Sequence, residues 1–87
     1  MSRIEKEITV MNPQGLHARP AAMFVQIASQ YSANISVKKD KEVVNGKSIM
    51  GILMLGAQNK SKIILTIDGD DAEEAMQALE EFLITHE

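Results

Sequence analysis

The segment from Gly15 to Ala22 holds the residues with the clearest capacity for chemistry, and it reads Gly-Leu-His-Ala-Arg-Pro-Ala-Ala. Proline is favoured in the first turn of a helix, where its missing N–H costs no hydrogen bond, so Pro20 predicts a helix start with His17 just outside it. The free amides and partial positive charge at a helix N-terminus favour anions, and the guanidinium of Arg19 suits phosphate. The segment therefore predicts a phosphate-handling site around His17.

An imidazole can hold such a phosphate covalently. Near neutral pH a large fraction of ordinary histidine side chains is uncharged, and an uncharged ring nitrogen of His17 can attack phosphorus. The resulting phosphoramidate is a reactive phosphoryl donor, which suits a relay that accepts a group and passes it on. The second histidine, His86, is expected near a helix C-terminus and is assigned no chemistry. With no cysteine and no metal-ligand spacing between the histidines, no metal site is predicted.

A second segment, Lys47-Ser48-Ile49-Met50-Gly51-Ile52-Leu53-Met54-Leu55-Gly56, predicts a short helix. Ser48 stands where an N-cap residue would, because a serine oxygen there accepts a backbone N–H. Gly51 costs about 1 kcal/mol relative to alanine inside a helix, which indicates either close approach of another surface or a loose helix. Ile52 and Leu55 are expected to point inward, whereas Met54 is left open. The rest of the run is too apolar to be fully buried and predicts a docking surface.

Together the two segments resemble the motifs of the HPr family, the histidine-containing phosphocarriers of the bacterial phosphotransferase system. The likeness extends to length, element order and the acidic C-terminal helix, so we expect a single domain over residues 1–87. The resemblance implies that Nδ1 of His17 accepts a phosphoryl group from phosphorylated enzyme I, in a chain that begins with phosphoenolpyruvate, and donates it to the EIIA domains of sugar permeases. It also implies that Arg19 and the backbone N–H of Ala18 steady the phosphate. Such a protein is a carrier and not an enzyme, and it needs no cofactor.

The resemblance gives Ser48 two possible roles. In some family members a dedicated kinase, the HPr kinase/phosphorylase, phosphorylates the corresponding serine, and in others the serine is not used in this way. The candidate docking residues by resemblance are Ala18, Arg19, Ala22, Ile49, Met50 and Leu53. Two alternatives stay open: a paralogous carrier of a nitrogen-related or fructose branch, and a regulatory module that binds a transcriptional regulator through phospho-Ser48. Regulator-only relatives lack the histidine, so the presence of His17 favours the relay.

Composition agrees with a small soluble domain. Apolar residues make up 45% and charged residues 24% of the chain, which is typical of globular proteins. The absence of cysteine fits a reducing compartment, and no run approaches the roughly 18 apolar residues of a membrane span, so a cytoplasmic protein is expected. A net charge of -3 disfavours nucleic acid as a ligand. We therefore expect protein partners and a monomeric carrier.

Hydrophobic periodicity predicts the elements that must position the site. Alternation predicts strands around residues 4–10, 35–37 with a hairpin partner at Val43, and 63–67. Apolar stripes predict a helix from Pro20 to about Tyr31 and a last helix, and their members are Ala21, Phe24, Val25 and Ala28 in the first and Ala72, Ala75, Met76, Leu79, Phe82 and Leu83 in the second. A capping box is predicted for the last helix, from Asp70 with Glu73 or from Asp71 with Glu74.

The order strand, helix, strand, strand, helix, strand, helix predicts an α+β two-layer domain. The resemblance adds an open-faced sandwich in which three helices cover one face of a four-stranded antiparallel sheet. The hairpin turn at Asp40-Lys41 lacks glycine, so a type I′ turn would be strained and a different turn geometry is predicted. Residues Asn59-Lys60-Ser61-Lys62 are interpreted as a solvated polar turn rather than a basic patch.

Overall fold

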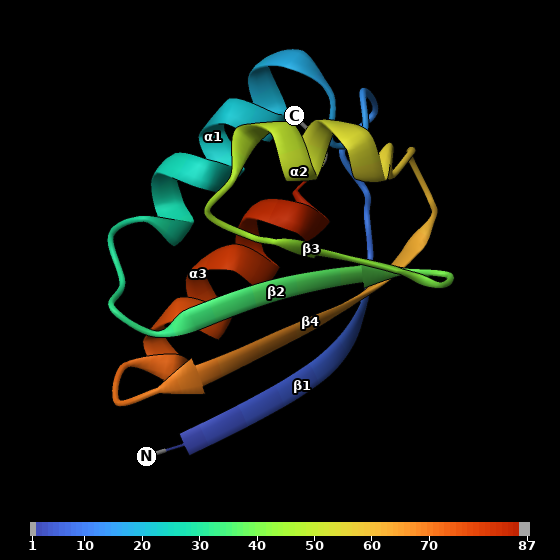
Figure 1. Ribbon diagram of the computed structural model, residues 1–87. Helices are drawn as coiled ribbons and strands as arrows, with labels where there is room; N and C mark the ends of the chain where they lie inside the picture. Colours follow the sequence, from blue (N-terminus) through green and yellow to red (C-terminus); the bar gives the residue numbers. More distant parts are fainter. Residues whose placement is uncertain (1, 86–87) are drawn as a thin grey trace.

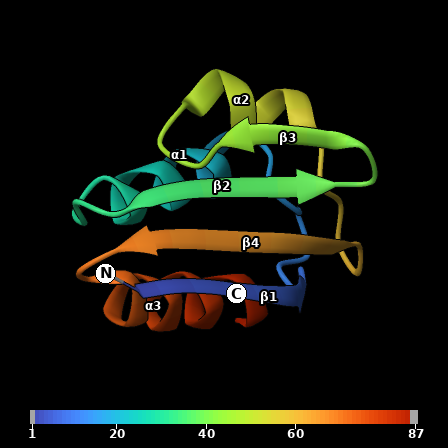
Figure 2. The same ribbon diagram turned by 60° about the horizontal axis from the view of Figure 1, so that its bottom comes forward.

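The computed structural model describes residues 2–85 and shows a four-stranded sheet with three helices (Figure 1). The elements follow the predicted order, and their bounds are β1 Ser2–Thr9, α1 Ala18–Ala28, β2 Asn34–Lys39, β3 Glu42–Asn45, α2 Ile49–Leu55, β4 Lys62–Gly69 and α3 Ala72–Ile84. All strand pairs are antiparallel, and the helices lie on one face of the sheet (Figure 2). The predicted α+β open-faced sandwich is confirmed. Over the described residues, the structure contains no helix long and apolar enough to cross a membrane.

The strand β4 lies in the interior of the sheet, whose order is β1-β4-β2-β3. It pairs with β1 from Ser2 opposite Gly69 to Thr9 opposite Lys62, and its other edge pairs with β2. Its side chains alternate between the helix-covered face and the open face, as the sequence predicts. The buried row of β4 joins a core built from all three helices, whose fully buried large side chains include Phe24, Leu16, Ile52, Ile63, Leu65, Ile67, Leu79 and Leu83.

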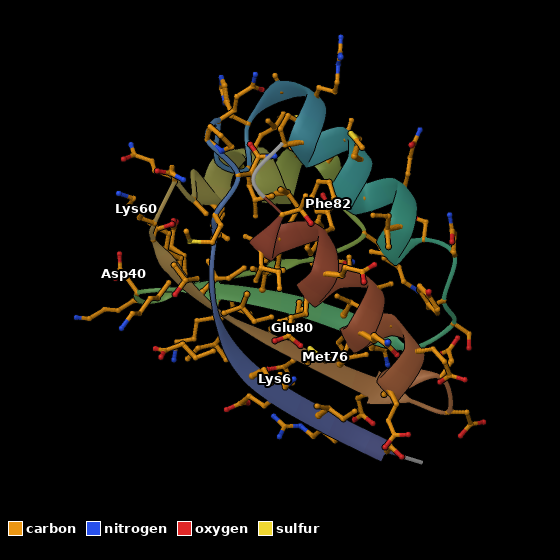
Figure 3. The ribbon with its side chains drawn as sticks, turned by 180° about the vertical axis from the view of Figure 1, so that it is seen from behind. Lys6, Asp40, Lys60, Met76, Glu80 and Phe82 are labelled. Atoms are coloured by element: carbon orange, nitrogen blue, oxygen red, sulfur yellow. The ribbon has the colours of Figure 1, made fainter. Side chains whose placement is uncertain are left out.

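The edge strand β1 carries a charged residue on its core-facing row. Ile4 and Ile8 pack on the helices as predicted, and Lys6 lies between them on the same face. Its ammonium contacts the Glu80 carboxylate of α3 at 2.8 Å (Figure 3). Because the Lys6 side chain is 50% and the Glu80 side chain 33% exposed, solvent screens the pair, which adds at most about 1 kcal/mol. The ion pair links the edge strand β1 to the helix α3.

The capping box predicted for the last helix is wrong. Asp71 is the N-cap residue of α3, but its carboxylate makes no cap hydrogen bond. Instead it accepts backbone N–H groups from Ser32 at 2.9 Å and Ala33 at 3.0 Å. These two donors lie just before β2. The Asp71 carboxylate therefore binds backbone N–H groups of a distant segment in place of an N–H group in the first turn of its own helix. The Ser32 N–H, with a smaller contribution from Ala33, holds the pKa of the Asp71 carboxyl below its ordinary value, although partial desolvation opposes the shift.

The turn between β2 and β3 and the turn at the end of α1 both bear on predictions made from the sequence. The β2–β3 hairpin has Asp40 at φ 56°, whereas Lys41 is not among the described residues at positive φ, so the turn is not type I′ and the predicted departure is confirmed. The helix α1 ends at Ala28, three residues before the predicted end at Tyr31. The chain there tightens into a turn in which the Tyr31 N–H donates to the Ala28 carbonyl at 3.2 Å.

Candidate functional site

The loop between β1 and α1 is seated directly on the segment that follows α2. The Leu16 side chain is buried, and its N–H donates to the Ala57 carbonyl at 2.7 Å. Gly15 has φ 68°, and a Cβ atom at this position would lie 2.5 Å from the Ala57 oxygen and 2.9 Å from the Gln58 Cα. Only glycine fits both the backbone conformation and the space. The buried Leu16 thus fixes the position of the next residue, His17.

An asparagine turn shapes the first half of this loop. The Asn12 side chain is buried, and its Oδ1 accepts the Gln14 N–H at 2.8 Å. Its carbonyl accepts the Gly15 N–H at 2.9 Å. Asparagine favours such turns because its side chain mimics a backbone acceptor two residues away. The turn formers that the sequence places at residues 12–15 therefore build a defined, partly buried loop.

Contacts from two distant elements hold the same loop. The Asn59 amide donates to the carbonyls of Met11 at 3.2 Å and Asn12 at 3.1 Å. On the other side, the Met11 N–H donates to the Leu83 carbonyl at the end of α3, at 2.8 Å. Residues 58–60 are exposed, which agrees with the solvated turn predicted there, but the contribution of Asn59 was missed. No local sequence pattern indicates these hydrogen bonds of Asn59, since their partners are 47 and 48 residues away in the chain.

His17 is the N-cap residue of α1, and its side chain is exposed and makes no cap hydrogen bond. The prediction that it lies just outside the helix is confirmed. The helix begins at Ala18, two residues before the predicted start, and Pro20 still falls within the first turn. Ala18 has φ 49°, which turns the chain from the extended His17 into the helix. The N–H groups of Ala18 and Arg19 have no intrahelical partner, so they are available to an anion on the imidazole.

Arg19 supplies the positive side chain next to His17. It is exposed, and the first turn of α1 contains no acidic residue to neutralise it. Arg19 borders a cleft of about 380 Å³, whose other lining residues are Asn12, Gln14, Pro20, Met23, Phe82 and Thr85. Phe82 of α3 lies on the side of that helix that faces α1 (Figure 3). Because His17 does not line this cleft, the cleft is a neighbour of the imidazole and not the reaction centre.

Ser48 is the N-cap of α2, as predicted. Its Oγ accepts the Gly51 N–H at 3.1 Å. A Cβ on Gly51 would lie 3.2 Å from the Val44 Cβ and 3.4 Å from the Asn45 carbonyl oxygen, so the glycine marks a close approach to β3 and not a loose helix. Ser48 lies at the far end of this seven-residue helix from Ala57, about 10 Å along the axis.

The surface of α2 is apolar where the sequence predicts docking. Ile52 and Leu55 are buried, as expected, whereas Met50 is 63% and Met54 is 71% exposed. Ile49 is also exposed, and Leu53 is half-buried, so Leu53 offers less surface than its neighbours. The helices α1 and α2 pack side by side (Figure 1). Ala22 of α1 is exposed. Of the sequence-predicted residues, His17, Ala18 and Arg19 form one site, and Ser48 stands apart from them. His86 lies outside the described residues.

An open-faced α+β sandwich that presents an exposed histidine at a helix start is the arrangement of a small phosphocarrier. The family described as PTS HPr component phosphorylation site matches residues 4–85, and the chain belongs to this HPr family. The HPr-like protein Crh of Halalkalibacterium halodurans is 45% identical over 80 residues, covering 92% of this chain and 95% of the relative.

Two solved structures extend the comparison. A phosphocarrier protein HPr from Bacillus anthracis matches with a TM-score of 0.92 and 44% identity, covering 95% of this chain and 99% of that one. An HPr dimer from Thermoanaerobacter tengcongensis matches with a TM-score of 0.72 and 53% identity over 85% of each chain. The second of these shows that a similar chain can be found as a dimer, so the monomer expected here stays a prediction.

Proposed function

We propose that this protein carries a phosphoryl group on His17 between the proteins of a sugar phosphotransferase system. The observation that carries the proposal is the exposed His17 side chain at the start of α1, beside amides of Ala18 and Arg19 that have no intrahelical acceptor. In the transfer, an imidazole nitrogen of His17 forms a bond to phosphorus while the bond from phosphorus to the donor protein breaks. The second transfer reverses these roles and delivers the group to an EIIA domain.

The surroundings of His17 favour the phosphorylated state. The positive end of the α1 dipole and the guanidinium of Arg19 stabilise the added negative charge, and no acidic residue stands in the first turn. Leu16 is fixed in the core, so the backbone that carries the imidazole is held in place at the start of α1. We infer that Ala18 and Arg19 contact the phosphate, with enzyme I as donor.

The test is phosphorylation of the purified protein by enzyme I and labelled phosphoenolpyruvate. His17→Ala is expected to lose all label, whereas His86→Ala, which removes the other histidine, keeps it. The label should be labile in acid, as a phosphoramidate is. Label retained in His17→Ala would refute the assignment of the acceptor, and no label on the unchanged, folded chain beside an active control carrier would refute the relay.

Arg19 has its own matched control. Arg19→Glu reverses the charge next to His17 and is expected to slow both receipt and donation of the phosphoryl group. Arg3→Glu makes the same change on an exposed residue of β1, where the Arg3 guanidinium contacts the Glu5 carboxylate at 3.4 Å, and should leave both rates near those of the unchanged protein. Equal rates for the two variants would remove Arg19 from the site.

We also propose that phosphorylation of Ser48 regulates the relay, because Ser48 caps a helix on the candidate docking surface. A phosphate at the amino end of α2 meets no acidic residue in the first turn, so the fold should survive it. Ser48→Asp should weaken binding of enzyme I in calorimetry, with Ser48→Ala as the uncharged control. Equal binding by the two variants would contradict this regulation.

A further inference from the structure

Every sulfur atom of this protein belongs to a methionine side chain. The chain has six methionines and no cysteine. Among the exposed large apolar side chains of the described residues, Met54 at 71% and Met50 at 63% are the most open to solvent. Met76, in contrast, is only 3% exposed, on the buried side of α3. Access to a water-borne oxidant therefore differs strongly between the two groups.

The two exposed thioethers lie along the helix whose end contacts the His17 loop, with Met54 near that end and Met50 about one turn further away. Met50 and Met54 are four residues apart on α2, so they project from the same face of the helix. Just beyond Met54, the chain reaches Ala57, whose carbonyl accepts the Leu16 N–H at 2.7 Å. The end of α2 thus abuts the loop that holds His17. A partner that covers the imidazole must approach close to these methionines.

We propose that Met50 and Met54 form a peroxide-sensitive modification site, at which oxidation to methionine sulfoxide weakens docking of the phosphoryl donor protein. The inference rests on the proposed function, because it concerns the surface through which His17 is reached. Oxidation replaces a flexible apolar side chain by a polar one that keeps its water, and methionine sulfoxide reductases reverse it. The site would couple the carrier to the oxidant level without changing His17.

The chemistry balances with hydrogen peroxide as the only co-reactant. A sulfur lone pair attacks one peroxide oxygen, the S–O bond forms and the O–O bond breaks. The second oxygen leaves with both electrons of that bond as hydroxide and takes up the proton released by the attacked oxygen, which gives water and the neutral sulfoxide. The sulfur is oxidised by two electrons, and the peroxide is reduced by two. No metal or cofactor is needed.

The first experiment maps oxidation in the intact, folded protein. Limited treatment with hydrogen peroxide, followed by peptide mass spectrometry, should convert Met50 and Met54 to the sulfoxide well before Met76. The unfolding temperature of the treated protein, measured in the same samples, should stay close to that of untreated protein. Oxidation of Met76 at the same rate as Met54, or loss of the fold on treatment, would overturn the inference.

The second experiment separates docking from the reactivity of His17. Burial of a methionine side chain is worth roughly 1.5–3 kcal/mol, so loss of one such contact should lower kcat/KM for phosphorylation by enzyme I about tenfold or more. Phosphorylation by potassium phosphoramidate, a small donor that needs no docking surface, should be unchanged. Treatment with methionine sulfoxide reductases should restore the enzyme I rate. Equal loss with both donors would mean that His17 itself is damaged and would overturn the inference.

The third experiment assigns the effect to the two residues. In Met50→Leu/Met54→Leu, the rate after peroxide is compared with the same variant before peroxide, and the ratio should be close to one. A fall as large as that of the unchanged protein would overturn the inference and direct attention to Met23, which is 44% exposed. A chain that enzyme I fails to label before any oxidation contradicts the proposed function itself, whereas equal labelling before and after oxidation contradicts this inference alone.

Discussion

Substitution of Gly15 by alanine should be far more destabilising than the same substitution at Gly56, although both glycines have positive φ. Their φ values are 68° and 63°, so an alanine at either position pays roughly 1–2 kcal/mol for the left-handed backbone. The two positions differ in space. A Cβ at Gly56 meets no heavy atom closer than the Met54 carbonyl oxygen at 3.9 Å, whereas a Cβ at Gly15 lies 2.5 Å from the Ala57 oxygen.

The contacts at Gly15 are with backbone, which cannot rotate away as a side chain can. Relief requires that the loop lift off the segment 57–58, at a cost on the order of 1–3 kcal/mol by analogy with overpacked cores. The expected loss of unfolding free energy is therefore about 1 kcal/mol for Gly56→Ala and about 3 kcal/mol for Gly15→Ala. A domain of this size has only about 4–13 kcal/mol in total, so the second loss is large.

Urea unfolding at neutral pH, followed by circular dichroism, measures both losses directly. The slopes of free energy against urea should be equal for the variants, so that the difference reflects the folded state. Gly15→Ala should also slow phosphorylation of His17, since a lifted loop breaks the bond from the Leu16 N–H to the Ala57 carbonyl. Equal destabilisation by the two substitutions would refute the claim that the loop is seated against segment 57–58.

Three further predictions concern stability. Ser48→Ala should lower the unfolding free energy by about 1 kcal/mol because the cap on the Gly51 N–H is lost, and thermal unfolding that is unchanged would contradict the cap. Lys60→Gly should raise it by up to about 1 kcal/mol in urea unfolding, because Lys60 has φ 73° and glycine carries no penalty there; a loss of stability would refute this. Asp71 has a lowered pKa, so its contribution is present above the ordinary value of 3.8 and is lost as pH falls through the lowered one. Asp71→Asn should therefore destabilise the protein at neutral pH and lose less of its stability on acidification than the unchanged chain, and parallel pH profiles would contradict the contact with Ser32.

The elements of this fold are readable from sequence because each is encoded locally. Alternation in β4 and the stripe of α3 follow from which side chains must meet the core, and Ser48 is recognisable because a cap depends on residues within one turn. The turn at Asp40 and Lys41 is predictable for the same reason, because a type I′ turn needs positive φ at both positions and lysine carries a steric cost there that glycine does not. Local rules therefore predict local structure.

The contacts that hold the site loop could not be predicted in this way. Asn59 binds carbonyls nearly fifty residues away, and Asp71 serves a segment 38 and 39 residues away in place of its own helix. A polar residue in a turn has the same sequence signature whether it faces water or a distant backbone group. The φ of 49° at Ala18 is likewise invisible in the sequence, because alanine is an ordinary helix former.

The sheet order also determines when each strand can pair while the chain is being synthesised on the ribosome. The strand β1 is made first, but β4, the strand that pairs with it in the described sheet, ends at Gly69. Until that residue has left the exit tunnel, β1 has no neighbouring strand, and Ile4 and Ile8 have no completed sheet in which to pack. The β2–β3 hairpin can close early, yet it cannot recruit β1 without the late strand between them. Such long-range pairing makes folding slower than in a helical bundle of the same size, and the nascent chain must be kept from other chains while it waits.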